Sequence, residues 1–263
     1  MNKLIILIFI SSLFFLSCGS SVKKPVIKLY AVKYGSSLYP SKYIYSYQPA
    51  GSKNFAWMFY LIQFNERNIL VDTGFSDQEN IANFKVEYTD PLSLLKELKL
   101  SPDDITDVII THSHFDHSGD IQKYKNANIY IQLQEMDELR KTEEMNMYLN
   151  KKQAEKKLFS FYNRYILNDF ISIKKVGGHS PGSCSVKLAT AEEVIFLPGD
   201  EAYFTENFEK NVPTGTSVNP AASAEFTYRL YKLLAVPGVK IFTFHDPGII
   251  PEKSGVKLVF EKK

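Results

Sequence analysis

Residues 111–119 read Thr-His-Ser-His-Phe-Asp-His-Ser-Gly and place four potential metal ligands within six residues: His112, His114, Asp116 and His117. One tetrahedral ion takes ligands that converge from different directions, so a single metal has little use for all four. A tight loop that points two side chains one way tends to point the next two another way. We therefore expect His112 and His114 to serve one ion, and Asp116 and His117 to serve a neighbouring ion.

The remaining potential ligands stand at similar places along the chain. The other two of the five histidines are His179, in Gly-Gly-His-Ser-Pro-Gly, and His245, in Phe-His-Asp-Pro, while Asp200 follows a glycine after an apolar run. Each lies where an expected strand ends in a glycine or proline turn, and loops on a rigid scaffold commonly assemble sites. A lone histidine is more often an ordinary core or surface residue, but five in such positions indicate a shared metal site.

Strand and helix patterns alternate around these loops. Apolar and β-branched runs predict strands over residues 26–33, 59–64, 68–71, 108–111, 185–188, 194–197, 241–244 and 256–260. Helical patterns cover residues 134–165 and about 224–234, and Ser101-Pro102 begins a short helix. The 134–165 pattern fits either a solvated helix with one packed face or part of a cap over a site. Together the elements predict two sheets packed face to face with helices outside, in a single α/β domain.

The N-terminus predicts export. Residues 1–17 carry Lys3 and an apolar run that is shorter than the roughly 20 residues of a membrane span, which is typical of a signal peptide. The following Ser17-Cys18-Gly19-Ser20 resembles a bacterial lipoprotein cleavage box, and we expect Cys18 to become the lipidated N-terminus. The protein would then be anchored to a bacterial membrane on its periplasmic or cell-surface side, with residues 18–25 as anchor and tether and 26–263 as the folded domain. The alternative is an ordinary secretory signal in which Cys18 has no role.

Composition narrows the classes of function. Lys and Arg total 31 against 29 Asp and Glu, a formal net charge of +2, so nucleic-acid binding receives no electrostatic support. The 44% hydrophobic content suffices for a sizeable core. The chain has 2 cysteines, so acylation of Cys18 would leave Cys184 without an intrachain disulfide partner, and we expect Cys184 to be a small buried residue.

The His-x-His-x-Asp-His cluster, preceded by Val-Asp-Thr-Gly at 71–74 and followed by the motifs around His179, Asp200 and His245, resembles the metallo-β-lactamase superfamily across residues 26–260. The resemblance implies an αβ/βα four-layer sandwich with two central mixed sheets and helices outside. It also implies two divalent metal ions, zinc in the first place and iron, manganese or cobalt as alternatives. By the same resemblance, the ligands of the first ion are His112, His114 and His179. The ligands of the second ion are Asp116, His117 and His245, and Asp200 bridges both ions. We interpret Asp72 as hydrogen-bonding a ligand imidazole, the alternative being a simple turn residue.

Within that superfamily, Gly199-Asp200-Glu201-Ala202-Tyr203 and the residues up to Val212-Pro213 resemble the N-acyl-homoserine lactone lactonases. Those enzymes carry a tyrosine three residues after the bridging aspartate, where this chain has Tyr203. A shorter segment between Gly74 and Leu92 departs from their pattern. Tyr203 could instead be a packing aromatic. The aromatic residues between 39 and 59 could likewise line an acyl pocket or pack into the first sheet.

The expected function is that of a binuclear metal-dependent hydrolase which opens the ester ring of lactones such as N-acyl-homoserine lactones by attack of a metal-bridging hydroxide. Tyr203 would stabilise the oxyanion, and Asp116 or a metal-bound water would protonate the leaving alkoxide. The alternatives are a glyoxalase II-like thioesterase, an organophosphate hydrolase and a β-lactamase. Asp200 disfavours the β-lactamase, and the 18 residues that follow His245 disfavour glyoxalase II. A non-catalytic metal-binding surface lipoprotein is an alternative from another class.

Overall fold

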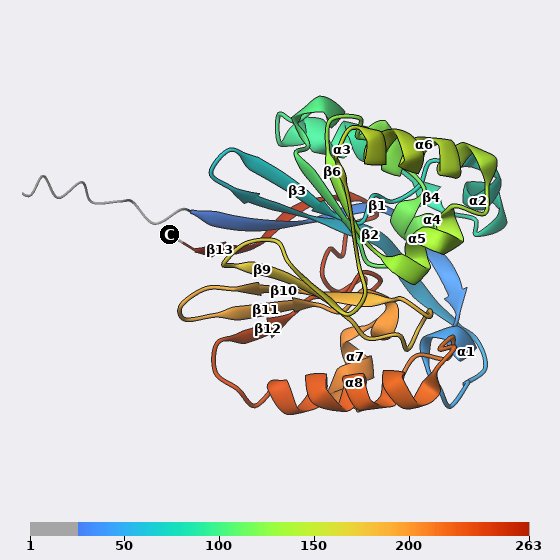
Figure 1. Ribbon diagram of the computed structural model, residues 1–263. Coiled ribbons are helices and arrows are strands. Elements are labelled where there is room, and N and C mark those ends of the chain that lie inside the picture. The colour runs from blue at the N-terminus through green and yellow to red at the C-terminus, as the bar shows by residue number, and fades with distance from the viewer. Residues whose placement is uncertain (1–25, 263) are drawn as a thin grey trace, which may run out of the picture.

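Two β-sheets lie face to face with helices against their outer surfaces, as Figure 1 shows for the computed structural model, which describes residues 26–262. Helices α2 to α6 lie outside the first sheet, and α8 runs along the outside of the second. The predicted four-layer αβ/βα sandwich is therefore confirmed. No helix within residues 26–262 is long and apolar enough to span a membrane.

The first sheet is mixed and has eight strands, seven of them in the order β13-β1-β2-β3-β5-β6-β7, with β4 pairing β1. Its strands are β1 (Ile27–Pro40), β2 (Ser52–Phe64), β3 (Arg67–Val71), β4 (Glu87–Tyr88), β5 (Asp107–Ile110), β6 (Asn128–Gln132), β7 (Leu158–Phe161) and β13 (Gly255–Lys262). The long β1 and β2 pair antiparallel, whereas β3, β5, β6 and β7 run parallel to one another. The carboxyl ends of these parallel strands therefore meet at one edge, where β5 leads into the histidine cluster.

The second sheet has five strands in the order β12-β11-β10-β9-β8. They are β8 (Arg164–Ile166), β9 (Ile171–Lys175), β10 (Cys184–Ala189), β11 (Val194–Leu197) and β12 (Val239–Ile241). Only β11 and β12 pair in parallel. The loops that carry the other predicted ligands leave β9, β11 and β12.

The helices are mostly short. Those of the first half are α1 (Ser41–Ile44), α2 (Gln78–Asn83), α3 (Pro91–Glu97), α4 (Phe115–Ser118), α5 (Leu133–Leu139) and α6 (Glu143–Ala154), with 3-10 turns η1 (Pro102–Asp104) and η2 (Ile121–Lys123). Those of the second half are η3 (Gly199–Glu201), α7 (Thr205–Glu209) and α8 (Pro220–Leu233). The helix predicted at 224–234 begins earlier because Asn219 caps it and Pro220 occupies its first turn.

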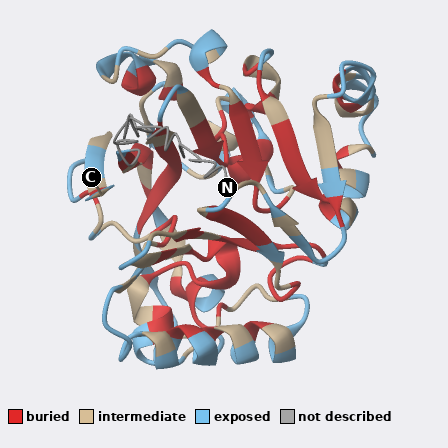
Figure 2. Cartoon of the chain, turned by 60° about the vertical axis from the view of Figure 1, so that its left-hand side comes forward, coloured by how far each residue is buried: buried red, intermediate tan, exposed pale blue. Residues whose placement is uncertain are grey.

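Alternation along β2 shows how the sequence builds two cores at once. Successive side chains of a strand point to opposite faces of a sheet. The side chains on one face belong to the core between the two sheets; they are Ala56, Met58, Tyr60 and Ile62. The side chains on the other face belong to the core beneath helices α3, α5 and α6; they are Phe55, Trp57, Phe59 and Leu61. Figure 2 shows buried residues concentrated in the sheets and on the inner sides of the helices. The first sheet is thus apolar on both faces, which explains its nearly continuous hydrophobic runs.

Two sequence predictions need correction. The helical pattern at 134–165 is wrong beyond Ala154, because Leu158–Phe161 pairs with β6 and Arg164–Ile166 pairs with β9. Lys156 adopts a left-handed φ of 58° just after the helix ends, and strand pairing then overrides the charged, helix-favouring surroundings. The strand predicted at 241–244 ends at Ile241, which frees Phe242 to His245 to form a loop.

Candidate metal centre

The seven predicted ligands lie on loops that leave strand ends of both sheets. His112 follows β5, and Asp116 and His117 stand in the single turn of α4, with His114 at its N-cap. His179 lies between β9 and β10, Asp200 in η3 directly after β11, and His245 shortly after β12. Residues separated by more than 130 positions in the sequence are thus brought to one place by the topology.

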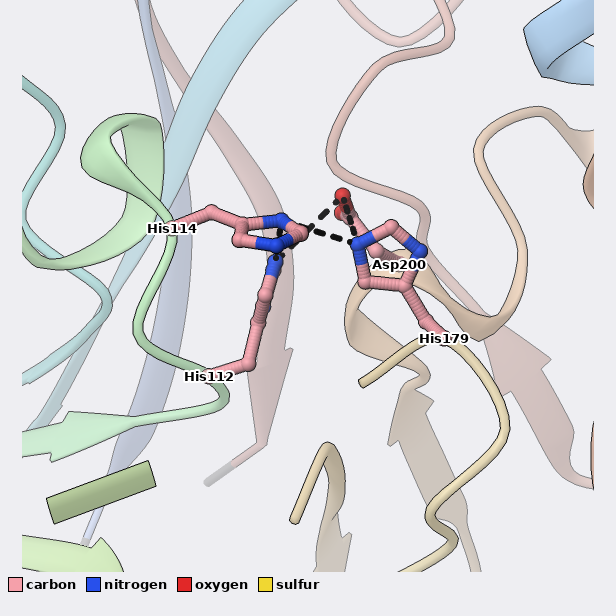
Figure 3. A group of neighbouring side chains, drawn as sticks. All are labelled: His112, His114, His179 and Asp200. Atoms are coloured by element: carbon pink, nitrogen blue, oxygen red, sulfur yellow. Dashed lines mark hydrogen bonds and ion pairs between the residues drawn. The ribbon is translucent and has the colours of Figure 1, made fainter. Parts of the chain in front are cut away.

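Four of these side chains form a first group. The ligand atoms of His112, His114, His179 and Asp200 all lie within 4.8 Å of one another. His114 Nδ1 is 3.0 Å from His112 Nε2 and 3.0 Å from His179 Nε2. Asp200 Oδ2 is 3.6 Å from His112 Nε2 and 3.4 Å from His179 Nε2. Figure 3 shows the three rings and the carboxylate pointing toward one another, with His112 and His114 on one loop and His179 and Asp200 on two others.

A second group shares Asp200. His117 Nε2 and His245 Nε2 each lie 3.0 Å from Asp200 Oδ1. Asp116 Oδ2 is 3.3 Å from His117 Nε2 and 3.7 Å from His245 Nε2. One oxygen of Asp200 therefore faces the first group and the other faces the second, which is an arrangement in which one carboxylate can bridge two ions.

The donor set fits two cations. Nitrogen and oxygen ligands at about 2.0–2.2 Å around a tetrahedral ion stand roughly 3.3–3.5 Å apart, and the distances given above scatter about that value. His117 Nε2 is buried and, within residues 26–262, has no hydrogen-bond partner, so a cation held between it and the neighbouring carboxylates would give this nitrogen a ligand role. Both groups consist only of imidazole nitrogens and carboxylate oxygens, the donors that zinc and the neighbouring transition metals accept.

The buried carboxylates of the two ligand groups favour the binding of a positive charge between them. Burial lowers the pKa of His179 to about 4 and that of His112 well below its usual range, so both rings are neutral, as metal ligands must be. Burial would lower the pKa of His117 too, but the carboxylates of Asp200, Asp116 and Asp72 outweigh it and raise that pKa well above its ordinary value. Three buried carboxylates thus surround one ring, and a divalent cation would offset more of their negative charge than a proton does.

Asp72 stands directly beneath the second group. Its side chain is fully buried, and its Oδ2 lies 2.7 Å from His117 Nδ1. The same carboxylate accepts hydrogen bonds from the backbone N–H of Thr111 at 2.7 Å and from the Thr111 hydroxyl at 2.8 Å. These contacts hold the His117 ring with its Nε2 toward Asp200, which is the contact with a ligand imidazole that the sequence interpretation assigned to Asp72.

Two buried glutamates that sequence reasoning missed hold the ligand loops. Glu135 of α5 accepts hydrogen bonds from Ser113 N and Ser113 Oγ with one oxygen, and from Ser180 Oγ and Gly182 N with the other. It thereby ties the loop of His112 and His114 to the loop of His179. Glu201 accepts from the backbone N–H groups of Gly178 and His179 at 3.0 and 3.1 Å. Neither glutamate has a local signal in the sequence, because its hydrogen-bond partners in these loops lie 18 or more residues away.

A largely aromatic pocket opens above the two groups. It has a volume of about 230 Å³ and is lined, besides ligand residues, by Tyr39, Phe55, Trp57, Phe84, Phe115, Tyr203, Thr216 and Val218. Some of the aromatic residues between 39 and 59 therefore line the pocket, while others, such as Phe59, pack in the core. Phe84 comes from the short segment between Gly74 and Leu92, so this segment contributes to the pocket wall.

Tyr203 is buried, and its ring packs edge-on against His245 with 5.1 Å between centroids. Its hydroxyl lies 3.0 Å from Thr216 Oγ1 at the pocket surface. Tyr203 thus packs against its neighbours and also lines the pocket. Cys184 is buried and unpaired within the described part of the chain, as expected, whereas Cys18 lies outside the described residues.

Comparison with known proteins defines the class. Residues 58–242 match the family model of the metallo-beta-lactamase superfamily, so the chain belongs to that superfamily and is a metallo-hydrolase. An N-acyl homoserine lactonase of Bacillus cereus is 30% identical over 254 residues, which cover 89% of this chain and 97% of that protein. The resemblance predicted from the motifs is confirmed.

Two solved structures show the same fold. An N-acyl homoserine lactone hydrolase with the product N-hexanoyl-L-homoserine bound at its catalytic metal centre superposes with a TM-score of 0.71 at 26% identity, covering 87% of this chain and 99% of that one. A probable metal-dependent hydrolase from Staphylococcus aureus has a TM-score of 0.73, covers 88% of this chain and 96% of that one, and shares 19% of its residues. At this identity, the similarity to the Staphylococcus aureus protein concerns the fold alone.

Proposed function

We propose that this metallo-hydrolase is a binuclear lactonase that opens the ester ring of N-acyl-homoserine lactones or related acylated lactones. The observation that carries the proposal is the placement of Tyr203, which lines an aromatic pocket above the two ligand groups and whose hydroxyl contacts Thr216 in the wall of the same pocket. The similarity to N-acyl homoserine lactonases of other bacteria supports the same substrate class.

His112, His114 and His179 would hold one divalent cation, Asp116, His117 and His245 would hold the other, and Asp200 would touch both. Such a pair supplies Lewis acidity and makes a water molecule nucleophilic at neutral pH. The side chains of the protein do the rest. Tyr203 donates a hydrogen bond to the oxygen that becomes negative when the ester carbonyl is attacked. Asp116, which lines the pocket, takes the proton released by the attacking water and passes it to the leaving alkoxide.

The pocket lining favours a neutral acylated substrate over the anionic alternatives. Among the described residues that line it, none is a lysine or an arginine. Glutathione thioesters and β-lactams carry carboxylates, which proteins commonly bind with these cationic side chains. A homoserine lactone with its acyl chain carries no charge, and the rings of Trp57, Phe84 and Phe115 offer apolar surface for that chain.

The test is a pH-stat panel with N-hexanoyl-homoserine lactone, S-lactoylglutathione, a β-lactam and a phosphotriester, each with and without a chelator. We expect the lactone to be the preferred substrate and its hydrolysis to stop on chelation and resume when metal is returned. Preferential turnover of any other member of the panel would replace the proposed substrate class. Binding of metal with no turnover of any member would favour the non-catalytic lipoprotein.

Tyr203→Phe tests the role of the hydroxyl within that reaction. Loss of one oxyanion donor should lower kcat by roughly tenfold to a thousandfold with little change in KM. The matched control is Tyr162→Phe, because Tyr162 is 77% exposed and does not line the pocket. Equal kcat values for the Tyr203 variant, the control and the parent protein would reduce Tyr203 to a packing residue.

We propose in addition that residues 1–17 are a signal peptide and that Cys18 is acylated and anchors the protein to a bacterial membrane. These residues lie outside the described part of the chain, and the proposal rests on the apolar run and the small residues around Cys18. In this proposal residues 18–25 are the anchor and tether, and the folded domain begins at residue 26. Mass spectrometry of the N-terminal peptide should show a lipid increment on Cys18, and a peptide that lacks it would contradict the anchor.

A further inference from the structure

The loop between α7 and α8 holds Thr216 firmly at the wall of the pocket. The backbone N–H of Gly215 donates to Tyr43 O at 2.9 Å, and that of Val218 donates to His179 O at 3.3 Å. A Cβ atom at position 215 would lie only 2.0 Å from Lys42 O, so glycine is required for this approach. Thr216 stands between these two anchors, and its side chain lines the pocket.

The Thr216 hydroxyl touches two residues of the proposed catalytic site. Its Oγ1 lies 3.2 Å from His179 Nδ1 and 3.0 Å from the Tyr203 hydroxyl. Within residues 26–262 these are the two side chains with which Thr216 Oγ1 makes hydrogen bonds. One threonine therefore joins a ligand of the first group to the residue proposed to stabilise the oxyanion.

The directions of these hydrogen bonds follow from the role of His179. Its Nε2 faces His114 and Asp200, so a neutral ring that uses Nε2 as a ligand carries its proton on Nδ1. That Nδ1–H donates to Thr216 Oγ1. The Thr216 hydroxyl proton then has the Tyr203 oxygen as its acceptor. Because the Tyr203 oxygen accepts this proton, its own O–H remains available to donate into the pocket.

We propose that Thr216 is a positioning residue that keeps His179 in the tautomer needed for metal binding and turns the Tyr203 O–H toward the substrate oxyanion. The second half of this inference, the orientation of the Tyr203 O–H, rests on the proposed lactonase function. The first half concerns metal binding alone and can be tested without any substrate.

The experiment compares Thr216→Val, which keeps the shape but removes the hydroxyl, with Thr216→Ser, which keeps the hydroxyl. Zinc affinity, measured by competition with a chromophoric chelator, should fall about tenfold in the valine variant, the usual scale for losing a partner of a ligand histidine. The serine variant should bind zinc as the parent does. Equal zinc affinity in the parent and both variants would overturn the tautomer role, whether or not the protein hydrolyses lactones.

The second half is tested by turnover at saturating zinc in a double-mutant cycle with Tyr203→Phe. Thr216→Val should lower kcat on the lactone about tenfold, leave KM within about twofold, and cost little more when Tyr203 is already phenylalanine. Independent, multiplying losses in the double variant would overturn the coupling to Tyr203.

Thr214→Val is the matched control, because the buried Thr214 hydroxyl in the same loop contacts Ser217 rather than the site. It should leave kcat and zinc affinity within about twofold of the parent values. A loss in Thr214→Val equal to that in Thr216→Val would assign both effects to general loop damage and overturn the proposal. A parent protein that binds zinc but hydrolyses no lactone would instead refute the proposed function and leave the zinc comparison valid.

Discussion

Glu135→Gln should destabilise the protein strongly although it exchanges only one oxygen for an NH₂ group. Each carboxylate oxygen of Glu135 accepts one backbone N–H and one serine hydroxyl, at distances from 2.6 to 2.9 Å. Whichever way the glutamine amide turns, its NH₂ group faces either Ser113 N–H or Gly182 N–H. A serine hydroxyl can rotate and become an acceptor, but a backbone N–H cannot. One backbone donor is therefore left without an acceptor.

The loss of stability can be worked out from the hydrogen bonds that Glu135→Gln removes or weakens. An unsatisfied buried donor costs about 1–3 kcal/mol, and the two bonds kept by the amide oxygen lose their ionic character at about 1 kcal/mol each. Because such terms are not fully additive, we expect a loss of about 2–4 kcal/mol in the free energy of unfolding. For a domain of this size that loss lowers Tm by about 5–15 °C.

The assay is urea unfolding of the metal-free protein, followed by zinc competition on the folded protein. Glu138→Gln is the control, because Glu138 lies on the same helix and makes an exposed ion pair with Lys141. Such pairs contribute little, so the control should stay within about 0.5 kcal/mol of the parent. Zinc affinity should fall only in the Glu135 variant, since its two ligand loops are no longer tied together. A Glu135 variant as stable as the control would show that the four hydrogen bonds of this carboxylate contribute little to the stability of the fold.

The other predictions concern the ligand loops. Asp72→Asn should weaken binding of the second cation about 10–100-fold, because the carboxylate that orients His117 is lost. A zinc titration that resolves the two binding steps measures this change. An unchanged second step would show that Asp72 is only a turn residue. Gly178→Ala should cost about 1–3 kcal/mol in urea unfolding, because a Cβ there would lie 2.3 Å from Glu201 Oε2 and 2.8 Å from the backbone of Ser223. A fully stable alanine variant would mean that the His179 loop has room to shift.

The ligands could be predicted from the sequence because their signals are local. His112 to His117 form a short motif, and His179, Asp200 and His245 each stand beside a turn residue at a strand end. Strand patterns in the core were readable in part: β5 was predicted to within one residue at each end, whereas the long β1 and β2 were predicted only over residues 26–33 and 59–64. The strand and helix patterns predicted two sheets with helices outside, and the four-layer αβ/βα arrangement was implied by the family resemblance that the motifs carry.

The supporting residues could not be predicted, because their roles depend on contacts made across the fold. Glu135 lies in a stretch rich in Lys and Glu, where a carboxylate normally faces water, yet it is only 1% exposed. Thr216 is an ordinary loop threonine until the fold places it between His179 and Tyr203. Strand β7 was missed for the same reason, because its pairing with β6 outweighs the helical bias of its surroundings.

We propose that Asp200 joins two cation sites into one catalytic centre. The most direct measurement is the zinc content per chain, by elemental analysis after equilibrium dialysis, of the parent protein and Asp200→Asn. An amide has one strong ligand oxygen where the carboxylate has two, and Asp200 Oδ1 and Oδ2 face different ligand groups. We predict about two zinc ions per chain for the parent, and a clear loss of zinc together with most of the hydrolytic activity for the variant. A variant that keeps the zinc content and the turnover of the parent would contradict the two-metal account.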